Sequence, residues 1–196
     1  MATKAERTKQ FILETAAPLY NEKGISGVSI DDVLEATKLT KGCIYGHFQG
    51  KDDLSEQVIE YSLNNLTEKI TAAVLKETTA KAKINAFMDF YKNPINTYIN
   101  GGCPLFNTAV EADDNYPAIK QKVAARFLAG QEALCEVLQQ GIDNGEFSSQ
   151  LNPARFAFKM VAAIEGGIVI CRTIDSAQPM YELVNDLKKE LENYSQ

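Results

Sequence analysis

The chain has 196 residues, of which 45% are hydrophobic and 23% charged, a composition typical of a globular protein with either one large domain or a small head joined to a larger body. No apolar run approaches the roughly 20 residues needed to span a bilayer, and the charged N-terminus lacks the pattern of a secretion signal, so we expect a cytoplasmic protein with no membrane partner. The net charge of −6 excludes a uniformly basic nucleic-acid-binding protein, but residues 1–51 carry seven Lys/Arg against six Asp/Glu, so this part has a charge of +1 and the remainder −7.

Apolar residues recur with helical spacing along the whole chain, and no segment shows the alternation of a strand. We therefore predict an all-α protein of about nine helices. Three of them form an N-terminal domain, residues 1–50, and six form a C-terminal domain, residues 51–196. No internal repeat or low-complexity segment interrupts this pattern.

The first three helices have recognisable ends. The Thr3 hydroxyl and the Glu6 carboxylate are spaced as a capping box at the start of the first helix, and Gly24 is the residue type that ends a helix. Ser29 begins a second, short helix, and Thr40 caps a third that we expect over residues 41–48.

Six further helices are expected in the C-terminal domain. Prolines at first helical positions, where their missing N–H is harmless, help to locate several of their starts. The predicted ranges are about 25 residues from Lys51, then 81–100, 103–112, 117–145, 153–170 and 179–191, with a turn at 113–115.

Residues 29–54 contain two short helices joined by a tight turn, which is the pattern of a helix-turn-helix whose second helix enters a major groove about 12 Å wide. Gly42 and Gly46 lie within this second helix, where glycine is unfavourable by roughly 1 kcal/mol relative to alanine. Close approach of the backbone to DNA would explain them. Lys41, Tyr45 and His47 add side-chain donors for phosphates.

Residues 40–54 read TKGCIYGHFQGKDDL and resemble the signature Ser/Thr-Lys-Gly-x-x-Tyr-x-His-Phe-x-x-Lys-x-x-Leu of the TetR/AcrR family of bacterial transcriptional regulators. The specific resemblance covers about residues 7–60. It implies phosphate contacts from Ser29, Thr40, Tyr45, His47 and Lys51, and it places Lys41, Gly42 and Cys43 at base edges. At Lys38 family members commonly have glycine, so we expect either a left-handed lysine or a turn of different shape. Alternatives stay open for Tyr45, which could pack against the first helix, and for His47, which could pack or cap.

The resemblance also implies a small-molecule effector site in the C-terminal domain. Our candidate ligand-binding residues are Phe87, Tyr91, Tyr98, Cys103, Phe106, Asn107, Glu111, Phe127 and Phe158. The alternative is that most of them are core residues, because aromatic residues at helical spacing normally pack. Residues 101–111 resemble a segment of a TetR subgroup in which the cysteine senses electrophiles. Cys103, near a helix start, is therefore either a reactive thiol or a buried structural one.

Residues 153–194 are expected to form the homodimer interface. Small residues on one helix allow a second helix to approach closely, and a leucine stripe follows on the next. The candidate interface residues are Ala163, Gly166, Gly167, Leu183, Leu187 and Leu191. Packing within one chain is the alternative reading of the same pattern.

These features predict a DNA-binding regulator, most simply an effector-responsive repressor that binds a pseudo-palindromic double-stranded operator as a homodimer. The single histidine and the dispersed cysteines provide no catalytic or metal-ligand pattern, so we expect no enzyme activity, cofactor or metal. A helical protein that binds a small molecule or a protein partner, without operator DNA, is the alternative function.

Overall fold

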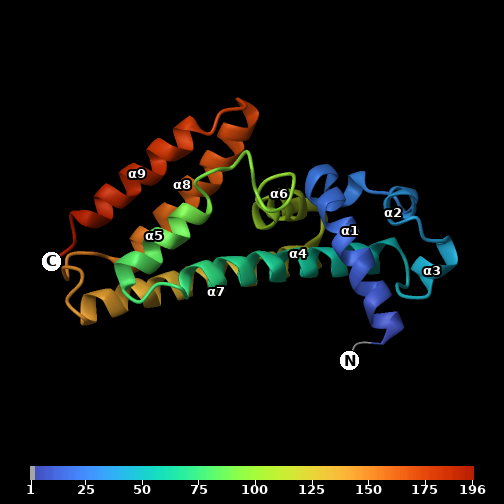
Figure 1. Cartoon of the computed structure of the whole chain (residues 1–196), viewed down its shortest axis with the longest axis horizontal. Helices are drawn as coiled ribbons and strands as arrows, with labels where there is room; N and C mark the ends of the chain where they lie inside the picture. The colour runs from blue at the N-terminus through green and yellow to red at the C-terminus, as the bar shows by residue number, and fades with distance from the viewer. Residues whose placement is uncertain (1–2) are drawn as a thin grey trace. The chain divides into compact units, whose positions relative to one another are not determined.

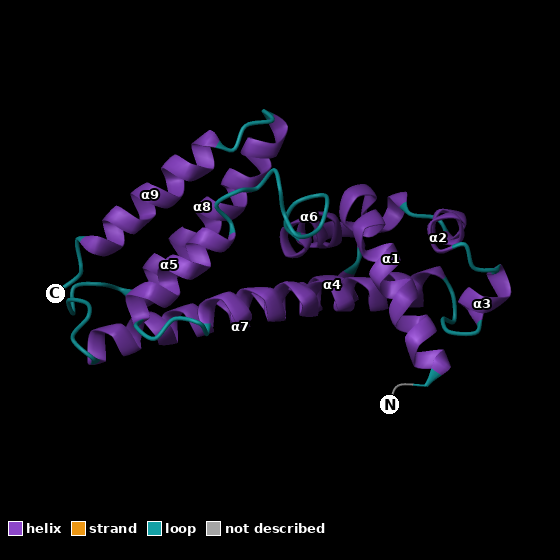
Figure 2. Ribbon diagram, viewed as in Figure 1, coloured by secondary structure: helices purple, strands orange, loops and turns teal. Residues whose placement is uncertain are grey.

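The computed structural model describes residues 3–196, and this part of the chain forms nine α-helices (Figure 1). Their bounds are α1 Lys4–Gly27, α2 Ile30–Thr37, α3 Lys41–Tyr45, α4 Lys51–Val74, α5 Ala80–Phe90, α6 Pro104–Asn115, α7 Pro117–Asp143, α8 Pro153–Thr173 and α9 Gln178–Glu192. Figure 2 shows helices and connecting loops in this part of the chain, and the only β-pairing there is an isolated bridge between Phe147 and Ser195. The all-α prediction is confirmed.

The chain divides into two compact units, neither of which is one continuous segment. Unit 1 contains the described residues up to Leu66 together with Ile99–Val123, and unit 2 contains Thr67–Tyr98 together with Ala124–Gln196. Unit 1 therefore includes α1, α2, α3 and α6, and unit 2 includes α5, α8 and α9. Helices α4 and α7 each supply residues to both units.

The core of unit 1 forms because apolar residues on α1 to α4 meet on one side of each helix. Ile12 and Ala16 of α1, Val33 of α2, Ile44 of α3 and Leu54 of α4 are completely buried in one cluster. Burying the isoleucine, valine and leucine side chains stabilises a domain by about 1.5–3 kcal/mol each. This shared core fixes α3 relative to α1 and α2 even though α3 is a single short helix.

The predicted helix starts are confirmed by hydrogen bonds. The Glu6 carboxylate accepts from the Thr3 N–H at 2.7 Å, while the Thr3 hydroxyl accepts from the Glu6 N–H at 3.2 Å. Ser29 and Asp32 form the same reciprocal box at α2, and the Thr40 hydroxyl accepts from the Cys43 N–H at 3.3 Å at α3. These bonds satisfy N–H groups that a helix start otherwise leaves without partners.

Positive φ angles occur near the ends of α1 and α2, where the chain changes direction. Gly24 has φ 77° and interrupts α1, as predicted, although a further short helical stretch continues to Gly27. Lys38 has φ 58° and ψ 22° and ends α2, so the turn contains a left-handed lysine. For a residue with a Cβ this conformation is unfavourable by roughly 1–2 kcal/mol.

The helix predicted over residues 81–100 is wrong in its second half, because α5 ends at Phe90. Pro94 explains the difference: it has no N–H to donate, and its ring disfavours helical geometry at Asn93. The Asn93 side chain instead accepts from the N–H groups of Ile95 and Asn96 at 3.3 Å and forms a turn.

Two other predicted helix ends require correction. Helix α3 ends at Tyr45 rather than Phe48, and Gly46 and His47 form a turn. The turn predicted at 113–115 is helical, because α6 continues to Asn115. The break occurs instead at Tyr116, φ −134° and ψ 76°, which precedes Pro117 and is therefore held outside the helical region.

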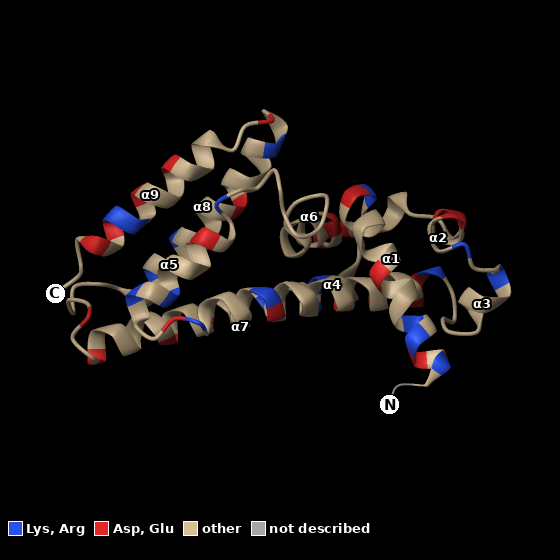
Figure 3. Cartoon of the chain, in the orientation of Figure 1, with Lys and Arg blue, Asp and Glu red and all other residues tan. Residues whose placement is uncertain are grey.

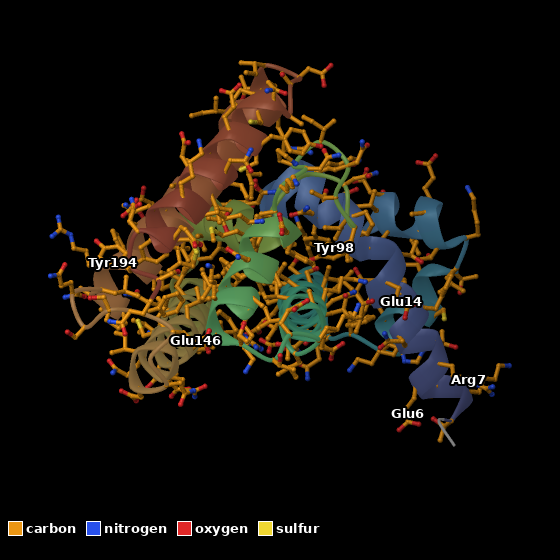
Figure 4. All side chains as sticks on the ribbon, turned by 60° about the vertical axis from the view of Figure 1, so that its left-hand side comes forward. Glu6, Arg7, Glu14, Tyr98, Glu146 and Tyr194 are labelled. Carbon is orange, nitrogen blue, oxygen red and sulfur yellow. The ribbon has the colours of Figure 1, made fainter. Side chains whose placement is uncertain are left out.

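In unit 2, α9 packs against both α8 and α5. The Glu146 carboxylate caps α5 by accepting from the N–H groups of Ala80 and Lys81 at 2.9 and 3.0 Å. The carbonyl of Tyr194 accepts from the Ser148 N–H at 2.7 Å, so the end of the chain is attached to the α7–α8 connection. Figure 4 labels Glu146 and Tyr194 in this region.

Within residues 3–196, none of the helices has the length and apolarity that a bilayer-crossing segment requires. The same residues contain no group of three or more His, Cys, Asp or Glu side chains arranged to hold a metal ion.

Candidate nucleic-acid interface

Helix α3 presents one face to the core and the other to solvent. Ile44 is completely buried, whereas the next side chain, Tyr45, is 46% exposed. Thr40 caps the start of this helix, and the side chains of Lys41 and Tyr45 are exposed. The predicted recognition element is therefore a surface feature of unit 1.

The structure places all eight predicted DNA-contacting residues at the surface of α3 and its flanking helix starts. Ser29 is the N-cap of α2, Thr40 is the N-cap of α3, and Lys51 is the first residue of α4. The exposed members are Ser29, Thr40, Lys41, Gly42 and Tyr45; the half-buried members are Cys43, His47 and Lys51.

Some of these groups already have intramolecular partners. The Ser29 hydroxyl donates to the Asp32 carboxylate at 2.5 Å, and the Lys51 ammonium donates to the carbonyl of Ser26 at 3.4 Å. The Lys51 ammonium has two further N–H bonds, so this contact directs it without using all its donors.

Cations lie close to aromatic rings around α3. The Lys41 ammonium lies 6.0 Å from the centre of the Tyr45 ring, and the Lys9 ammonium lies 5.7 Å from that of Phe48. Figure 3 shows Lys and Arg on the first part of α1 and at the start of α3, and Asp and Glu on α2. In Figure 4, Arg7 is labelled on this first part of α1. The sequence prediction did not include Lys9 among the site residues, because it lies outside the helix-turn-helix.

The two glycines of the recognition segment differ in what surrounds them. A Cβ added at Gly42 would have no atom within 4 Å, so no internal packing requires glycine there. A Cβ at Gly46 would lie 3.3 Å from the carbonyl oxygens of Gly42 and Cys43. Open space therefore lies beside Gly42 on the surface of α3.

A cluster of charges fixes the start of α2 next to the end of α1. The Lys23 ammonium donates to the Asp32 carboxylate at 2.6 Å. This bond, together with those from the Ser29 hydroxyl and backbone N–H, holds the pKa of Asp32 well below its ordinary range. The Asp32 carboxylate therefore remains ionised and retains its capping role at neutral pH.

The predicted ligand-binding residues fall into the two units. Phe87, Tyr91, Tyr98, Phe127 and Phe158 belong to unit 2, whereas Cys103, Phe106, Asn107 and Glu111 belong to unit 1. In unit 2, Phe87 is buried and its ring centre lies 5.4 Å from that of Tyr91. Phe90, which the sequence prediction omitted, connects this pair to Tyr98, with ring centres 5.0 Å from Tyr91 and 6.2 Å from Tyr98. Its spacing of three residues from Phe87 was the available signal.

The other ligand candidates have different surroundings. Phe158 is 65% exposed on α8, and Cys103 is buried at the N-cap of α6, the helix start where it was predicted. Asn107 and Glu111 both form hydrogen bonds with α1. An effector would reach these two side chains only by competing with those bonds.

The predicted dimer residues lie on α8 and α9. Leu187 and Leu191 are buried within the chain, and a Cβ at Gly167 would lie 2.9 Å from Met180 and 3.0 Å from Leu183. Gly167 therefore lies against α9, and burial within one chain accounts for Leu187 and Leu191. A Cβ at Gly166, by contrast, would have no atom within 4 Å, and Ala163 is half-buried. Exposed apolar side chains on α8 that the predicted dimer interface omitted are Phe158, Val169 and Ile170, and Ile174 follows at the C-cap.

A short capped helix, exposed on one face and preceded by a second helix across a tight turn, defines the class of helix-turn-helix DNA-binding proteins. Comparison with known proteins specifies the family. Residues 12–58 match the profile described as "Bacterial regulatory proteins, tetR family", and residues 80–187 match "Tetracyclin repressor-like, C-terminal domain". The chain belongs to the TetR family, whose members are transcriptional regulators.

Relatives along the full chain agree with this assignment. The chain is 21% identical over 172 residues to the HTH-type transcriptional repressor DhaR of Mycobacterium sp. strain GP1, a match that covers 88% of this chain and 86% of DhaR. A TetR family regulator from Cytophaga hutchinsonii is 32% identical, with a TM-score of 0.89 and coverage of 100% and 98%. A TetR regulator from Chloroflexus aurantiacus is 29% identical, with a TM-score of 0.93 and 98% coverage of both chains.

Proposed function

We propose that this regulator is an effector-responsive repressor that binds a pseudo-palindromic operator as a homodimer in the cytoplasm. The observation that carries the proposal is the surface position of Tyr45 on a helix whose opposite side, at Ile44, is completely buried. Residues 1–50 serve as the DNA-binding domain, and residues 51–196 supply the effector and dimer functions.

In this proposal the contacts to DNA divide into two kinds. Thr40, Tyr45, His47 and Lys51 bind phosphates and set the position of α3 in the groove, as does Ser29 through the start of α2. Lys41, Gly42 and Cys43 face base edges. Lys41 is the strongest candidate for reading sequence, because a lysine ammonium donates well to the guanine O6 and N7 acceptors of the major groove.

The homodimer is proposed to form through the outer face of α8. Phe158, Gly166, Val169 and Ile170 recur at spacings that place them on one side of this helix, and Ile170 is 58% exposed. Exposed apolar residues grouped on one helix face favour association with a second apolar surface. A second copy of the chain would place two recognition helices in successive major grooves, roughly 34 Å apart.

The effector is proposed to contact the aromatic group of unit 2, formed by Phe87, Phe90, Tyr91 and Tyr98. Aromatic rings whose centres lie 5.0 to 6.2 Å apart form an apolar wall of the kind that lines small-molecule sites. An effector releases DNA only if it binds the DNA-free conformation more tightly, by about 1.4 kcal/mol for each tenfold loss of operator affinity. A sensing role for Cys103 is a separate proposal, and unchanged electrophile-induced release of a Cys103→Ser variant would exclude it.

Selection of bound DNA from a random pool, with the mass of the protein measured in solution, tests the proposal. We expect enrichment of one pseudo-palindrome and a mass of two chains. If the purified protein enriches no sequence and binds no oligonucleotide, the proposal is wrong, and a helical protein that binds a small molecule or partner becomes the better description.

Two variants then separate the two kinds of contact. Tyr45→Phe removes one phenol–phosphate hydrogen bond, worth about 1.5–3 kcal/mol, so it should weaken binding to all sequences alike. Lys41→Ala should instead reduce the preference for the selected operator over unrelated DNA. If Tyr45→Phe reduces only this preference, its assignment to phosphate is contradicted.

A further inference from the structure

The Glu111 carboxylate of α6 caps the last part of α1 from 85 residues further along the chain. Its Oε2 accepts from the Ile25 N–H at 2.6 Å, and its Oε1 accepts from the Ser26 N–H at 2.8 Å and from the Ser26 hydroxyl at 2.9 Å. Hydrogen bonds from backbone N–H groups to a carboxylate are about twice as strong as neutral ones. The carboxylate therefore holds the segment that connects α1 to α2.

Gly24 makes this arrangement possible. Its φ of 77° interrupts α1 and exposes the N–H groups that follow, and a Cβ at this position would lie only 2.6 Å from Oε2 of Glu111. Glycine here thus provides both the left-handed backbone and the space for the carboxylate.

Asn107, one helical turn before Glu111, forms a second set of bonds with α1. Its side-chain amide donates to the carbonyl of Asn21 at 3.2 Å and to the Asn21 side-chain oxygen at 3.0 Å. The Asn21 amide in turn donates to the carbonyl of Gly102 at 3.1 Å. Residues spaced by four lie on one face of a helix, so one side of α6 supplies both sets.

The segment that Glu111 holds, Ile25 and Ser26, also contacts the start of α4. The Ser26 residue that Glu111 holds offers its carbonyl to the Lys51 ammonium at 3.4 Å. The hydrogen bonds therefore run in sequence from Glu111 to Ser26 and from Ser26 to Lys51, all within unit 1.

We propose that Glu111, assisted by Asn107, is a positioning residue for DNA binding, which acts by fixing Ser26 so that its carbonyl directs the Lys51 ammonium toward a DNA phosphate. This inference rests on the proposed operator-binding function. Neither Glu111 nor Asn107 touches DNA in this arrangement. Loss of the Glu111 bonds lets the carbonyl of Ser26 move, and the long Lys51 side chain, no longer directed, loses its phosphate contact because ordering it now takes too much conformational freedom.

The test measures affinity for the operator selected by the wild-type protein as a function of salt. In Glu111→Gln the side-chain oxygen can still accept from one of the two backbone N–H groups, those of Ile25 and Ser26. The NH₂ group faces the other N–H and cannot accept from it. We expect about tenfold weaker binding and a slope of log K against log salt reduced in magnitude by about 1, which is the change expected for Lys51→Ala. Because both changes act through Lys51, the double variant should bind no more weakly than Lys51→Ala alone.

Asp113→Asn is the matched control, since it also neutralises a carboxylate on α6. The Asp113 carboxylate pairs with Lys120 rather than with α1. This substitution should leave affinity and salt slope unchanged. Ser26→Ala is the milder variant should Glu111→Gln unfold, because it removes only the hydroxyl bond; we expect about threefold weaker binding and no further loss when combined with Lys51→Ala.

The outcomes separate the inference from the function on which it rests. Wild-type protein that binds no DNA overturns the proposed function itself. If the wild-type protein binds but Glu111→Gln leaves the salt slope unchanged, the positioning role alone is overturned. The same holds if the loss of affinity from Glu111→Gln or Ser26→Ala adds fully to that from Lys51→Ala.

Discussion

The phenol oxygen of Tyr20 lies 2.9 Å from the hydroxyl oxygen of Ser55, a buried contact between α1 and α4. The Ser55 hydroxyl donates its only hydrogen to the carbonyl of Lys51 at 2.7 Å. Tyr20 must therefore be the donor to Ser55. Burial raises the pKa of the Tyr20 phenol, which favours the protonated form that this bond requires.

This direction of donation makes the two single substitutions unequal. Tyr20→Phe removes the donor but leaves the Ser55 hydroxyl bonded to Lys51, so we expect a loss of about 1 kcal/mol in the free energy of unfolding. Ser55→Ala leaves the phenol buried without its acceptor, and we expect a loss of about 2 kcal/mol. Urea unfolding of the full chain measures both.

The double variant Tyr20→Phe with Ser55→Ala is the control for this pair. Because it leaves no unsatisfied phenol, its loss should be smaller than the sum of the two single losses. Equal single losses that add would show that Tyr20 is not the donor.

Replacing the left-handed Lys38 by glycine should stabilise the protein. Glycine adopts φ 58° without the steric penalty of a Cβ, although it gains more freedom in the unfolded chain. The difference predicts a net gain of about 0.5–1 kcal/mol in the free energy of unfolding, visible as a higher urea midpoint at pH 7.

Lys38→Ala is the matched control for this substitution. It removes the same side chain beyond Cβ but retains the steric penalty, so we expect no comparable gain. If alanine and glycine stabilise equally, the lysine side chain, rather than its backbone conformation, is the unfavourable feature.

Asp32 should make stability depend on pH in the acidic range. Its pKa is lowered in the folded protein by Lys23 and by the two Ser29 groups, whereas in the unfolded chain it lies near 3.9. A lowered folded pKa stabilises the protein above the unfolded value, and this contribution is lost as the pH falls below it. The difference in unfolding free energy between wild type and Asp32→Asn should therefore be constant from about pH 7 to 5 and shrink below about pH 4.

Asp31→Asn is the comparison for this measurement, because Asp31 is the exposed neighbour in the same helical turn. We expect a smaller effect at pH 7 than that of Asp32→Asn. A difference between wild type and Asp32→Asn that stays the same down to pH 2 would contradict the role of the ionised carboxylate.

Features determined by neighbouring residues were predictable from the sequence. The caps at Thr3, Ser29 and Thr40 depend on side chains within three positions, and their spacing alone indicates them. The end of α5 was equally local, since Pro94 marks it, but the apolar spacing before it was extended too far along the chain. Both the successes and this error follow from short-range chemistry.

Features that depend on distant segments were not predictable in the same way. Nothing near Glu111 in the sequence indicates that its carboxylate binds Ile25 and Ser26, because that pairing exists only after α6 and α1 meet. The leucines of α9 show a related limit. An apolar stripe indicates that these side chains are buried, but it does not show whether the same chain or a second copy buries them. The fold places Leu187 and Leu191 inside one chain.

The adjacent glycines of α8 allow that distinction to be tested. Gly167 faces Met180 and Leu183 within the chain, whereas a Cβ at Gly166 meets nothing within 4 Å. Gly167→Leu should overpack the α8–α9 contact and reduce the free energy of unfolding by about 1–3 kcal/mol. Gly166→Leu should leave this packing intact but raise the dissociation constant of the proposed dimer by about tenfold or more, because a bulky side chain keeps a second helix at a distance.

Sedimentation equilibrium measures the dimer, and urea unfolding at one fixed protein concentration measures stability, since dimerisation makes apparent stability depend on concentration. Each glycine serves as the control for the other, because both substitutions add the same side chain one position apart. If Gly166→Leu leaves the dissociation constant unchanged while Gly167→Leu raises it, the interface lies away from the outer face of α8. In that case Val169 and Ile170 require another explanation for their exposure, because an apolar face that no second copy covers is unfavourable in water.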